Sequence, residues 1–245
     1  MLLNFYLRLL DNLWQKKEEL REIRSGTVIN KISKKQETAL KRAVDRIKEN
    51  IKEKYPDIEL RYDKQWKLVD IVTELKNNYP SVDFTYFFDS SSMRPDGGII
   101  SIVSKSGKKL PILISEKKNQ GTNDLRESEG KRKQAKGNAV ERLGKNVIGF
   151  RIAMKPESIF PFVCFGDGVD FSDDSSILDR VVTIAQFGDL NKIYLHNQEG
   201  GIFDRGSFYF RPETWTENEM YEICKEIAER SIHYYLSKYG KKDLK

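Results

Sequence analysis

Residues 95–118 read PDGGIISIVSKSGKKLPILISEKK. Two apolar runs, IISIV and LPILIS, flank a polar turn around Gly107. Apolar runs of this length on either side of a glycine-containing turn predict a β-hairpin. If the turn is centred at Ser106 and Gly107, each residue of the first strand pairs with a residue of the second such that the two residue numbers add to about 212 or 213. This register places Asp96 beside Glu116 or Lys117.

Asp96, Glu116 and Lys118 form a candidate metal-dependent catalytic centre. Side chains alternate between the two faces of a strand, so Glu116 and Lys118 project together while Lys117 points away. Magnesium prefers oxygen ligands and is usually held by one or two carboxylates together with several waters. A lysine beside the ion would screen the charge that develops on a phosphate during hydrolysis. Asp followed by Glu-x-Lys is therefore typical of a Mg²⁺-dependent phosphodiesterase, although each half alone is also common by chance in a chain with 33% charged residues.

The positive charge of the chain is concentrated around this hairpin. Residues 105–145 contain twelve Lys and Arg against five Asp and Glu, a net of +7, while the whole chain carries +6. Such a cluster is expected where a polyanion docks and releases counterions. A solvated lysine-rich loop is the alternative interpretation. The residues that we expect to contact phosphate are Arg94, Lys131, Arg132 and Lys145.

Composition favours a single α/β domain over residues 1–245, with a mixed central β-sheet flanked by helices. The chain has 245 residues, 38% of them hydrophobic, which is enough to bury a core. Cys164 and Cys224 lie in apolar patterns, which predicts buried thiols rather than a disulfide or a zinc site. No run approaches the length of a membrane span, and the N-terminus lacks a basic leader with a cleavage site. We therefore expect a cytoplasmic protein that does not contact membranes.

Other catalytic classes lack the residues they need. Histidine occurs only as His196 and His233, which leaves little from which to build a serine or cysteine triad. The sequence contains neither the glycine-rich phosphate loop of nucleotide-driven enzymes nor the dinucleotide-binding fingerprint.

Helices and strands alternate along the sequence. The first two dozen residues predict an amphipathic helix, and the role of this N-terminal region, residues 1–30, stays open. A capping box at Ser33 predicts the start of the next helix. The segment 134–147 has few apolar positions, which suits a helix that faces DNA better than a core helix. Further helices are expected at 33–55, 66–75, 134–147, 175–187 and 216–240, and further strands at 58–62, 82–88, 160–165, 192–196 and 207–211.

A second informative stretch, GNAVER, occupies residues 137–142 just after the basic run. Asn138 can bond the edge of adenine, Ala139 leaves room for a thymine methyl, and Arg142 can reach purine acceptors in the major groove. This combination favours reading of A·T pairs. The alternative is an ordinary capped turn into a helix.

The order of these motifs closely resembles that of the EcoRI family of type II restriction endonucleases. The likeness extends over roughly residues 35–240. It implies a homodimeric nuclease of the PD-(D/E)xK fold that cuts a palindromic DNA duplex with Mg²⁺, and a cognate DNA methyltransferase in the same system. The stretches that carry the resemblance are residues 91–98, 116–121, 130–132 and 137–142.

The resemblance implies a role for each matching residue. Asp96 and Glu116 would bind the metal, and Lys118 would be the catalytic lysine. Cleavage between the outer base and AATT would leave four-base 5′ extensions with 5′-phosphates. The residues that would read or brace a central AATT are Asn138, Ala139, Arg142, Gln120 close to a thymine, and Glu141 against the arginine of the partner subunit.

The outer base pair is less closely matched. Gln134, Ala135 and Lys136 replace the family's Met-Ala-Ala, and Lys136 coincides with an arginine that reads the outer pair in a relative that cuts CAATTG. Arg180 matches one arginine of a later helix, whereas its companion is replaced near Thr183. We therefore expect GAATTC first, with CAATTG or RAATTY as alternatives.

Two other functions stay open. A repair or junction-resolving nuclease of the same fold would keep the metal site and cut without a fixed sequence. A non-catalytic DNA-binding module would keep the basic surface and would need no acids.

Overall fold

The computed structural model describes residues 27–119, 130, 138–172, 175–196 and 204–244. A mixed five-stranded sheet with the order β1-β4-β5-β6-β7 forms its centre. The first three strands in this order are antiparallel and the last three are parallel, which confirms the predicted α/β class with a mixed central sheet. The strands are β1 (Leu60–Asp63), β4 (Gly98–Val103), β5 (Lys109–Asn119), β6 (Phe162–Asp167) and β7 (Ser207–Arg211).

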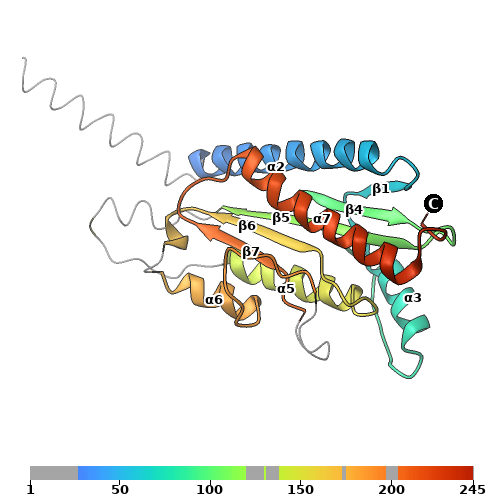
Figure 1. Cartoon of the computed structure of the whole chain (residues 1–245). Coiled ribbons are helices and arrows are strands. Elements are labelled where there is room, and N and C mark those ends of the chain that lie inside the picture. The colour runs from blue at the N-terminus through green and yellow to red at the C-terminus, as the bar shows by residue number, and fades with distance from the viewer. Residues whose placement is uncertain (1–26, 120–129, 131–137, 173–174, 197–203, 245) are drawn as a thin grey trace, which may run out of the picture.

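Helices cover both faces of this sheet (Figure 1). On one face α2 (Thr27–Lys54) packs beside α7 (Glu217–Tyr239). Within the described ranges, no helix combines the length and the apolar character that crossing a bilayer requires. The other face carries α3 (Leu68–Asn78), α5 (Asn138–Ala153) and α6 (Ile177–Ile184), next to the short strands β2 (Trp66–Lys67) and β3 (Ser92–Met93) and the 3-10 helix η1 (Val169–Phe171).

The β4–β5 hairpin has the predicted register. Gly98 pairs with Ser115 and Val103 pairs with Lys109, so paired numbers add to 213 on one side of a bulge at Ile112 of β5 and to 212 on the other. Gly107 in the turn has a φ of 79°, a left-handed conformation that glycine adopts without a Cβ clash. The turn before β4 is therefore held beside the last residues of β5.

An aromatic core fixes α5 against the sheet. Phe162 of β6 lies at the centre of this core, with ring centroids 5.5 to 6.1 Å from three other phenylalanines. Burying a side chain of this size contributes roughly 1.5 to 3 kcal/mol. The predicted free thiols, Cys164 and Cys224, are also buried. The four phenylalanines of this cluster, each at most 1% exposed, are Phe150, Phe160, Phe162 and Phe208.

The last helix begins and ends where the sequence predicts. Thr216 accepts from the Glu219 backbone N–H, and the Glu219 side chain accepts from the Thr216 N–H, which is a complete capping box. Gly240, with a φ of 80°, follows the last helical residue. The buried face of α2 is also the predicted one and consists of Leu40, Val44, Ile47 and Ile51.

Two helix starts differ from the prediction. α2 begins at Thr27, so Ser33 lies inside the helix and does not cap it. A capping box marks only a possible start of a helix. Once a helix has nucleated, each further residue that it orders adds one hydrogen bond, so the helix can extend past the capping signal. α3 begins at Leu68 rather than Trp66 because Trp66 and Lys67 pair with β3.

Two predicted strands are wrong. Residues 82–88 pair with no strand in the described part of the chain, and Phe87 and Phe88 are 89% and 70% exposed. Alternation of side chains is a local signal, whereas a strand also needs a neighbour with which to pair. Residues 192–196 form only an isolated bridge between His196 and Ile159.

The expectation that α5 would not be a core helix is wrong for one of its faces, whereas its contact with DNA stays a prediction. Its buried face packs into the core, and its opposite face is exposed at Arg142 and Lys145. The helix also extends past the predicted end at residue 147, as far as Ala153. The predicted helix at 175–187 ends at Ile184 as α6, because Gln186 and Phe187 adopt positive φ angles of 52° and 57°. The buried residues of α5 are Val140, Leu143, Val147 and Phe150.

Several predictions lie outside the described residues. They include the N-terminal helix up to residue 26 and the polar arm over residues 120–129 and 131–137. Six predicted site residues therefore have no structural description: Gln120, Lys131, Arg132, Gln134, Ala135 and Lys136.

Candidate active site

Asp96 and Glu116 lie side by side where the turn before β4 meets the end of β5. The Asp96 backbone N–H donates to Glu116 Oε2 at 3.2 Å. The Lys117 backbone N–H donates to Asp96 Oδ2 at 3.1 Å. These two bonds confirm the predicted placement of Asp96 beside Glu116 and Lys117.

Two glycines allow the turn to approach β5 this closely. A Cβ atom on Gly97 would lie 2.1 Å from Ser115 Oγ, and the Gly97 N–H donates to the Ser115 carbonyl at 2.9 Å. Gly98 has a φ of 80°, and a Cβ there would lie 2.5 Å from the Tyr62 ring. The Gly-Gly pair after Asp96 is thus required by the close contact of the backbones.

Lys118 completes the predicted group of three. Its Nζ donates to Asp96 Oδ2 at 3.2 Å and also forms an ion pair with Glu116 Oε1. Because Glu116 and Lys118 are two residues apart on β5, both side chains project from the same face of the strand. Two carboxylates and one amine therefore converge at one edge of the sheet.

The site holds more acid than its surroundings neutralise. Burial raises the pKa of Glu116, whose side chain is 1% exposed, and the nearby charge of Asp96 raises it further against the opposing effect of Lys118. Burial lowers the pKa of Lys118, but the charges of Glu116 and Asp96 outweigh burial, so this pKa lies well above its ordinary value. A cation added between the carboxylates would relieve their repulsion.

The donor set fits a magnesium ion. Asp96 and Glu116 offer hard oxygen ligands, and one or two carboxylates are what Mg²⁺ usually takes from a protein. Within the described ranges, no group of three or more His, Cys, Asp and Glu side chains is arranged to hold a metal. The remaining ligands would have to come from water or substrate.

Asn146 of α5 also reaches this site, and sequence reasoning missed it. Its Nδ2 donates to Glu116 Oε1 at 3.4 Å. Glu116 is therefore held by a backbone N–H on one oxygen and by Lys118 and Asn146 on the other. The available signal was its spacing, because Asn146 lies one helical turn after the candidate base reader Arg142.

Lys117 points to the opposite face of the sheet, as predicted. Its Nζ forms an ion pair with Asp167 of β6, and both side chains are at most 1% exposed. Burial lowers the pKa of Lys117, and the charge of Asp167 opposes this effect. The Lys117 amine also donates to the Lys118 carbonyl at 3.1 Å, and Asn119 Nδ2 donates to Asp167 Oδ1 at 3.2 Å. These contacts fix the end of β5 from behind the candidate site.

Comparison with known proteins assigns the chain to a family. The family model for the restriction endonuclease EcoRI matches residues 24–242. The chain belongs to the EcoRI restriction endonuclease family. It is 27% identical over 241 residues to the type II restriction enzyme RsrI of Cereibacter sphaeroides, covering 84% of this chain and 87% of that protein. It is 28% identical over 222 residues to the type II restriction enzyme EcoRI of Escherichia coli, covering 76% and 80% respectively.

Four of the predicted base-reading residues lie on two neighbouring helices of the described structure. Asn138 and Ala139 occupy the first turn of α5. Arg142 is exposed on the same helix, and Arg180 is exposed on α6, which packs against α5. The other exposed α5 residues with predicted roles are Glu141 and Lys145.

A groove of about 490 Å³ leads from Asp96 toward α2 and β1. The predicted phosphate contact Arg94 lines it, together with two lysines that sequence reasoning missed, Lys41 and Lys64. Glu37 and Asp45 also line the groove, so its charge is mixed rather than purely basic.

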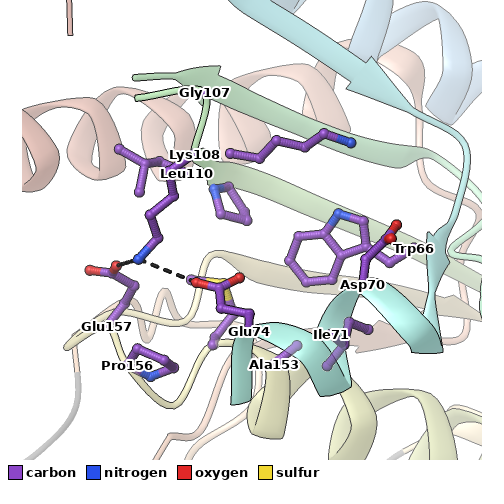
Figure 2. A pocket seen from close by; sticks show the side chains of 13 residues that line it. Trp66, Asp70, Ile71, Glu74, Gly107, Lys108, Leu110, Ala153, Pro156 and Glu157 are labelled. Atoms are coloured by element: carbon purple, nitrogen blue, oxygen red, sulfur yellow. Dashed lines mark hydrogen bonds and ion pairs between the residues drawn. The ribbon is translucent and has the colours of Figure 1, made fainter. Parts of the chain in front are cut away.

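A second cavity, of about 270 Å³, lies near the opposite end of the β4–β5 hairpin (Figure 2). The Trp66 indole forms one wall, and Lys108 projects between two carboxylates, Glu74 at 3.3 Å and Glu157 at 3.4 Å. Lys108 is thus already paired with two carboxylates of the protein. This cavity is separate from the Asp96–Glu116–Lys118 group.

Proposed function

We propose that this EcoRI-family chain is a Mg²⁺-dependent type II restriction endonuclease that cuts both strands of a palindromic, AATT-centred DNA site. GAATTC is the first expectation, followed by CAATTG and RAATTY. The products would carry four-base 5′ extensions and 5′-phosphates. The observation that supports this proposal most directly is the convergence of Asp96, Glu116 and Lys118 at one strand edge of a chain that matches the family over residues 24–242.

Asp96 and Glu116 would hold the ion. A bound Mg²⁺ supplies charge neutralisation at the phosphate and makes water a better nucleophile. The high pKa of Lys118 keeps its amine protonated, so it can donate to a phosphate oxygen as negative charge grows there. Lys117 and Asp167 hold β5 from behind and keep Glu116 and Lys118 in register. The reaction is in-line attack by water on phosphorus with departure of the 3′-oxygen, and it requires no covalent enzyme intermediate.

Base reading is assigned to α5 and its neighbours. Asn138, Ala139 and Arg142 would read the central AATT and Gln120 would approach a thymine. Glu141 would brace the arginine of the partner subunit. Backbone phosphates would bind Arg94, Lys131, Arg132 and Lys145, and the groove beside Asp96 adds Lys41 and Lys64 to this set. The outer base pair would be read by Gln134, Ala135, Lys136 and Arg180.

A homodimer is part of the proposal, because a palindrome presents the same site twice and each strand needs its own cut. Two isoleucines on the outward face of α5 support a second copy as the partner: Ile148 is 57% exposed and Ile152 is 45% exposed. An apolar stripe on the helix assigned to base reading would place two such helices next to each other on the DNA. A cognate methyltransferase would protect the host's own sites.

Plasmid cleavage tests the proposal. The purified protein is incubated with plasmids of known sequence and Mg²⁺, and the cut ends are sequenced. Discrete ends at AATT-containing hexamers are expected. Nicks at unrelated sequences would indicate a nuclease without sequence specificity, and intact DNA with a gel shift would indicate a binding module. Either result would overturn the proposed function.

A further inference from the structure

The hydrogen bond between Asn146 and Glu116 links two parts of the molecule that have separate roles in the proposed reaction. Glu116 belongs to the catalytic strand β5, and Asn146 belongs to α5. Asn146 Nδ2 lies 3.4 Å from Glu116 Oε1, on the oxygen that Lys118 also contacts. The other oxygen of Glu116 is fixed by the Asp96 backbone at 3.2 Å. An α5 side chain therefore helps to set the orientation of the buried carboxylate.

The same helix carries the candidate base readers. Arg142 lies one turn before Asn146, and Asn138 lies one further turn before Arg142. At 1.5 Å per residue these positions are about 6 and 12 Å from Asn146 along the helix axis. Residues four apart share a face of a helix, so a rotation or slide of α5 moves the base readers and Asn146 together.

The packing of α5 indicates that the helix behaves as one rigid body. Val140, Leu143, Val147 and Phe150 are all at most 2% exposed, and they attach the helix to the core along its whole length. Phe150 also lies 5.9 Å from the Trp66 ring and 6.1 Å from the Phe162 ring. A strain imposed at the DNA end of such a helix is transmitted along it because close-packed side chains resist local deformation.

We propose that Asn146 is a positioning residue that makes correct seating of α5 on the bases a condition for the productive orientation of Glu116. This inference rests on the proposed function. An amide suits the role because it donates a hydrogen bond without adding positive charge, so the acidic pair keeps its attraction for a cation. On a mismatched site, α5 would not seat fully, the Asn146 bond would lengthen, and Glu116 would turn away from the position that binds metal.

Three variants of the full-length protein test this role. Asn146→Ala removes the donor, Asn146→Gln keeps an amide donor on a longer side chain, and Asn77→Ala changes an exposed asparagine of α3 as a matched control. Thermal unfolding first verifies that each variant folds. Mg²⁺ binding is then measured by calorimetry, DNA binding by fluorescence anisotropy without metal, and cleavage on a cognate and a one-base-mismatched duplex.

We expect Asn146→Ala to weaken Mg²⁺ binding roughly tenfold to a hundredfold, as is typical when a group that orients a metal ligand is removed. Its metal-free affinity for cognate DNA is expected to match that of the unmodified protein. The ratio of cleavage rates between cognate and mismatched duplexes is expected to fall, because α5 seating no longer controls Glu116. Asn146→Gln is expected to recover part of the metal affinity, and Asn77→Ala to change nothing.

Two results would overturn the role. Unchanged Mg²⁺ affinity in Asn146→Ala would show that Asn146 does not orient Glu116. Weaker binding to all duplexes with an unchanged salt slope would identify Asn146 as an uncharged phosphate contact instead. If the unmodified protein cuts no DNA, the proposed function fails separately, because Mg²⁺ binding still reports on the Asn146–Glu116 contact without any cleavage.

Discussion

Glu116 and Glu157 are two buried glutamates in opposite electrostatic surroundings. Their side chains are 1% and 5% exposed. Glu157 accepts hydrogen bonds from four side chains: Lys238 at 2.6 Å, Tyr239 at 2.7 Å, Tyr234 at 3.3 Å and Lys108 at 3.4 Å. Burial alone would raise the pKa of Glu157, but the bonds from Lys238 and Tyr239 outweigh burial and lower it.

Glu116 differs because its nearest neighbours include another acid. Burial and the charge of Asp96 raise the pKa of Glu116, and the single amine of Lys118 does not compensate for them. The contrast separates two uses of a buried carboxylate. Glu157 is surrounded by donors and joins α7, the β4–β5 turn and the loop after α5. Glu116 is buried beside a second carboxylate, that of Asp96, and a metal ion bound between the two would favour their charged forms.

The largest expected difference between the two residues is in catalysis. Glu116→Gln removes a carboxylate from the candidate metal site, so we expect cleavage of an AATT-containing plasmid to slow by about a thousandfold or more. Glu157→Gln is the matched control and is expected to cut at the unmodified rate at temperatures well below its unfolding midpoint. Initial rates at saturating Mg²⁺ measure both. Equal cleavage rates for Glu116→Gln and Glu157→Gln would show that the two glutamates do not differ in their role in catalysis.

The response of stability to metal should also separate the two sites. Mg²⁺ that binds the folded state alone stabilises it by about 2.7 kcal/mol at a hundred times its Kd. We expect this gain in the unmodified protein and in Glu157→Gln, and little or none in Glu116→Gln. Urea unfolding with and without Mg²⁺ measures the gain. The same increase in all three proteins would place the ion elsewhere.

Without metal, Glu157→Gln should lower the stability of the fold more than Glu116→Gln does. Glu157→Gln leaves Lys238 without its carboxylate and Lys108 with Glu74 alone, and it is expected to reduce the free energy of unfolding by about 2 kcal/mol. Glu116→Gln loses the pairing with Lys118 but also removes the repulsion from Asp96, so we expect a change of less than about 1 kcal/mol. Urea unfolding in the presence of a chelator measures both values. A larger loss in Glu116→Gln would mean that Glu116 is a structural residue.

The smallest expected effect is the dependence of stability on pH at Glu157. Because folding lowers the pKa of Glu157, its contribution is fully present above the ordinary carboxyl pKa of 4.5 and is lost as pH falls through the lower folded value. The gap in stability between the unmodified protein and Glu157→Gln should therefore narrow below about pH 4.5. Thermal unfolding between pH 3 and pH 7 measures the gap. A constant gap would contradict the lowered pKa.

The convergence of Asp96, Glu116 and Lys118 could be predicted from sequence because it depends on local geometry. The turn at Gly107 sets the hairpin register, and the register sets the distance between Asp96 and Glu116. Side-chain alternation then separates Lys118 from Lys117. Each step involves residues that are close in sequence, so no knowledge of the remaining fold was needed.

Contacts between distant segments could not be predicted in this way. Asn146 meets Glu116 only because the aromatic core sets α5 on one face of the sheet. Lys117 finds Asp167 only because β6 pairs in parallel with β5. The four donors around Glu157 come from α7 and the β4–β5 turn, and nothing in the local sequence indicates them.

The two wrong strands have a related cause. Residues 82–88 and 192–196 have a strand-like pattern, but neither segment pairs continuously with another strand in the described part of the chain. The early start of α2 shows the same limit for helices, because the capping signal at Ser33 is compatible with a helix that begins at Thr27. Local patterns predicted the type of most elements and failed where pairing or helix extension decided the outcome.

Locating the metal tests the central claim most directly. Crystals grown with uncleaved cognate DNA are soaked in Mn²⁺, whose anomalous scattering marks its position in place of Mg²⁺. We predict a peak with carboxylate oxygens of Asp96 and Glu116 at about 2.1 Å. A peak only in the cavity beside Glu74 and Glu157, or none within reach of Asp96 and Glu116, would contradict the assignment of this acidic pair as the catalytic metal site.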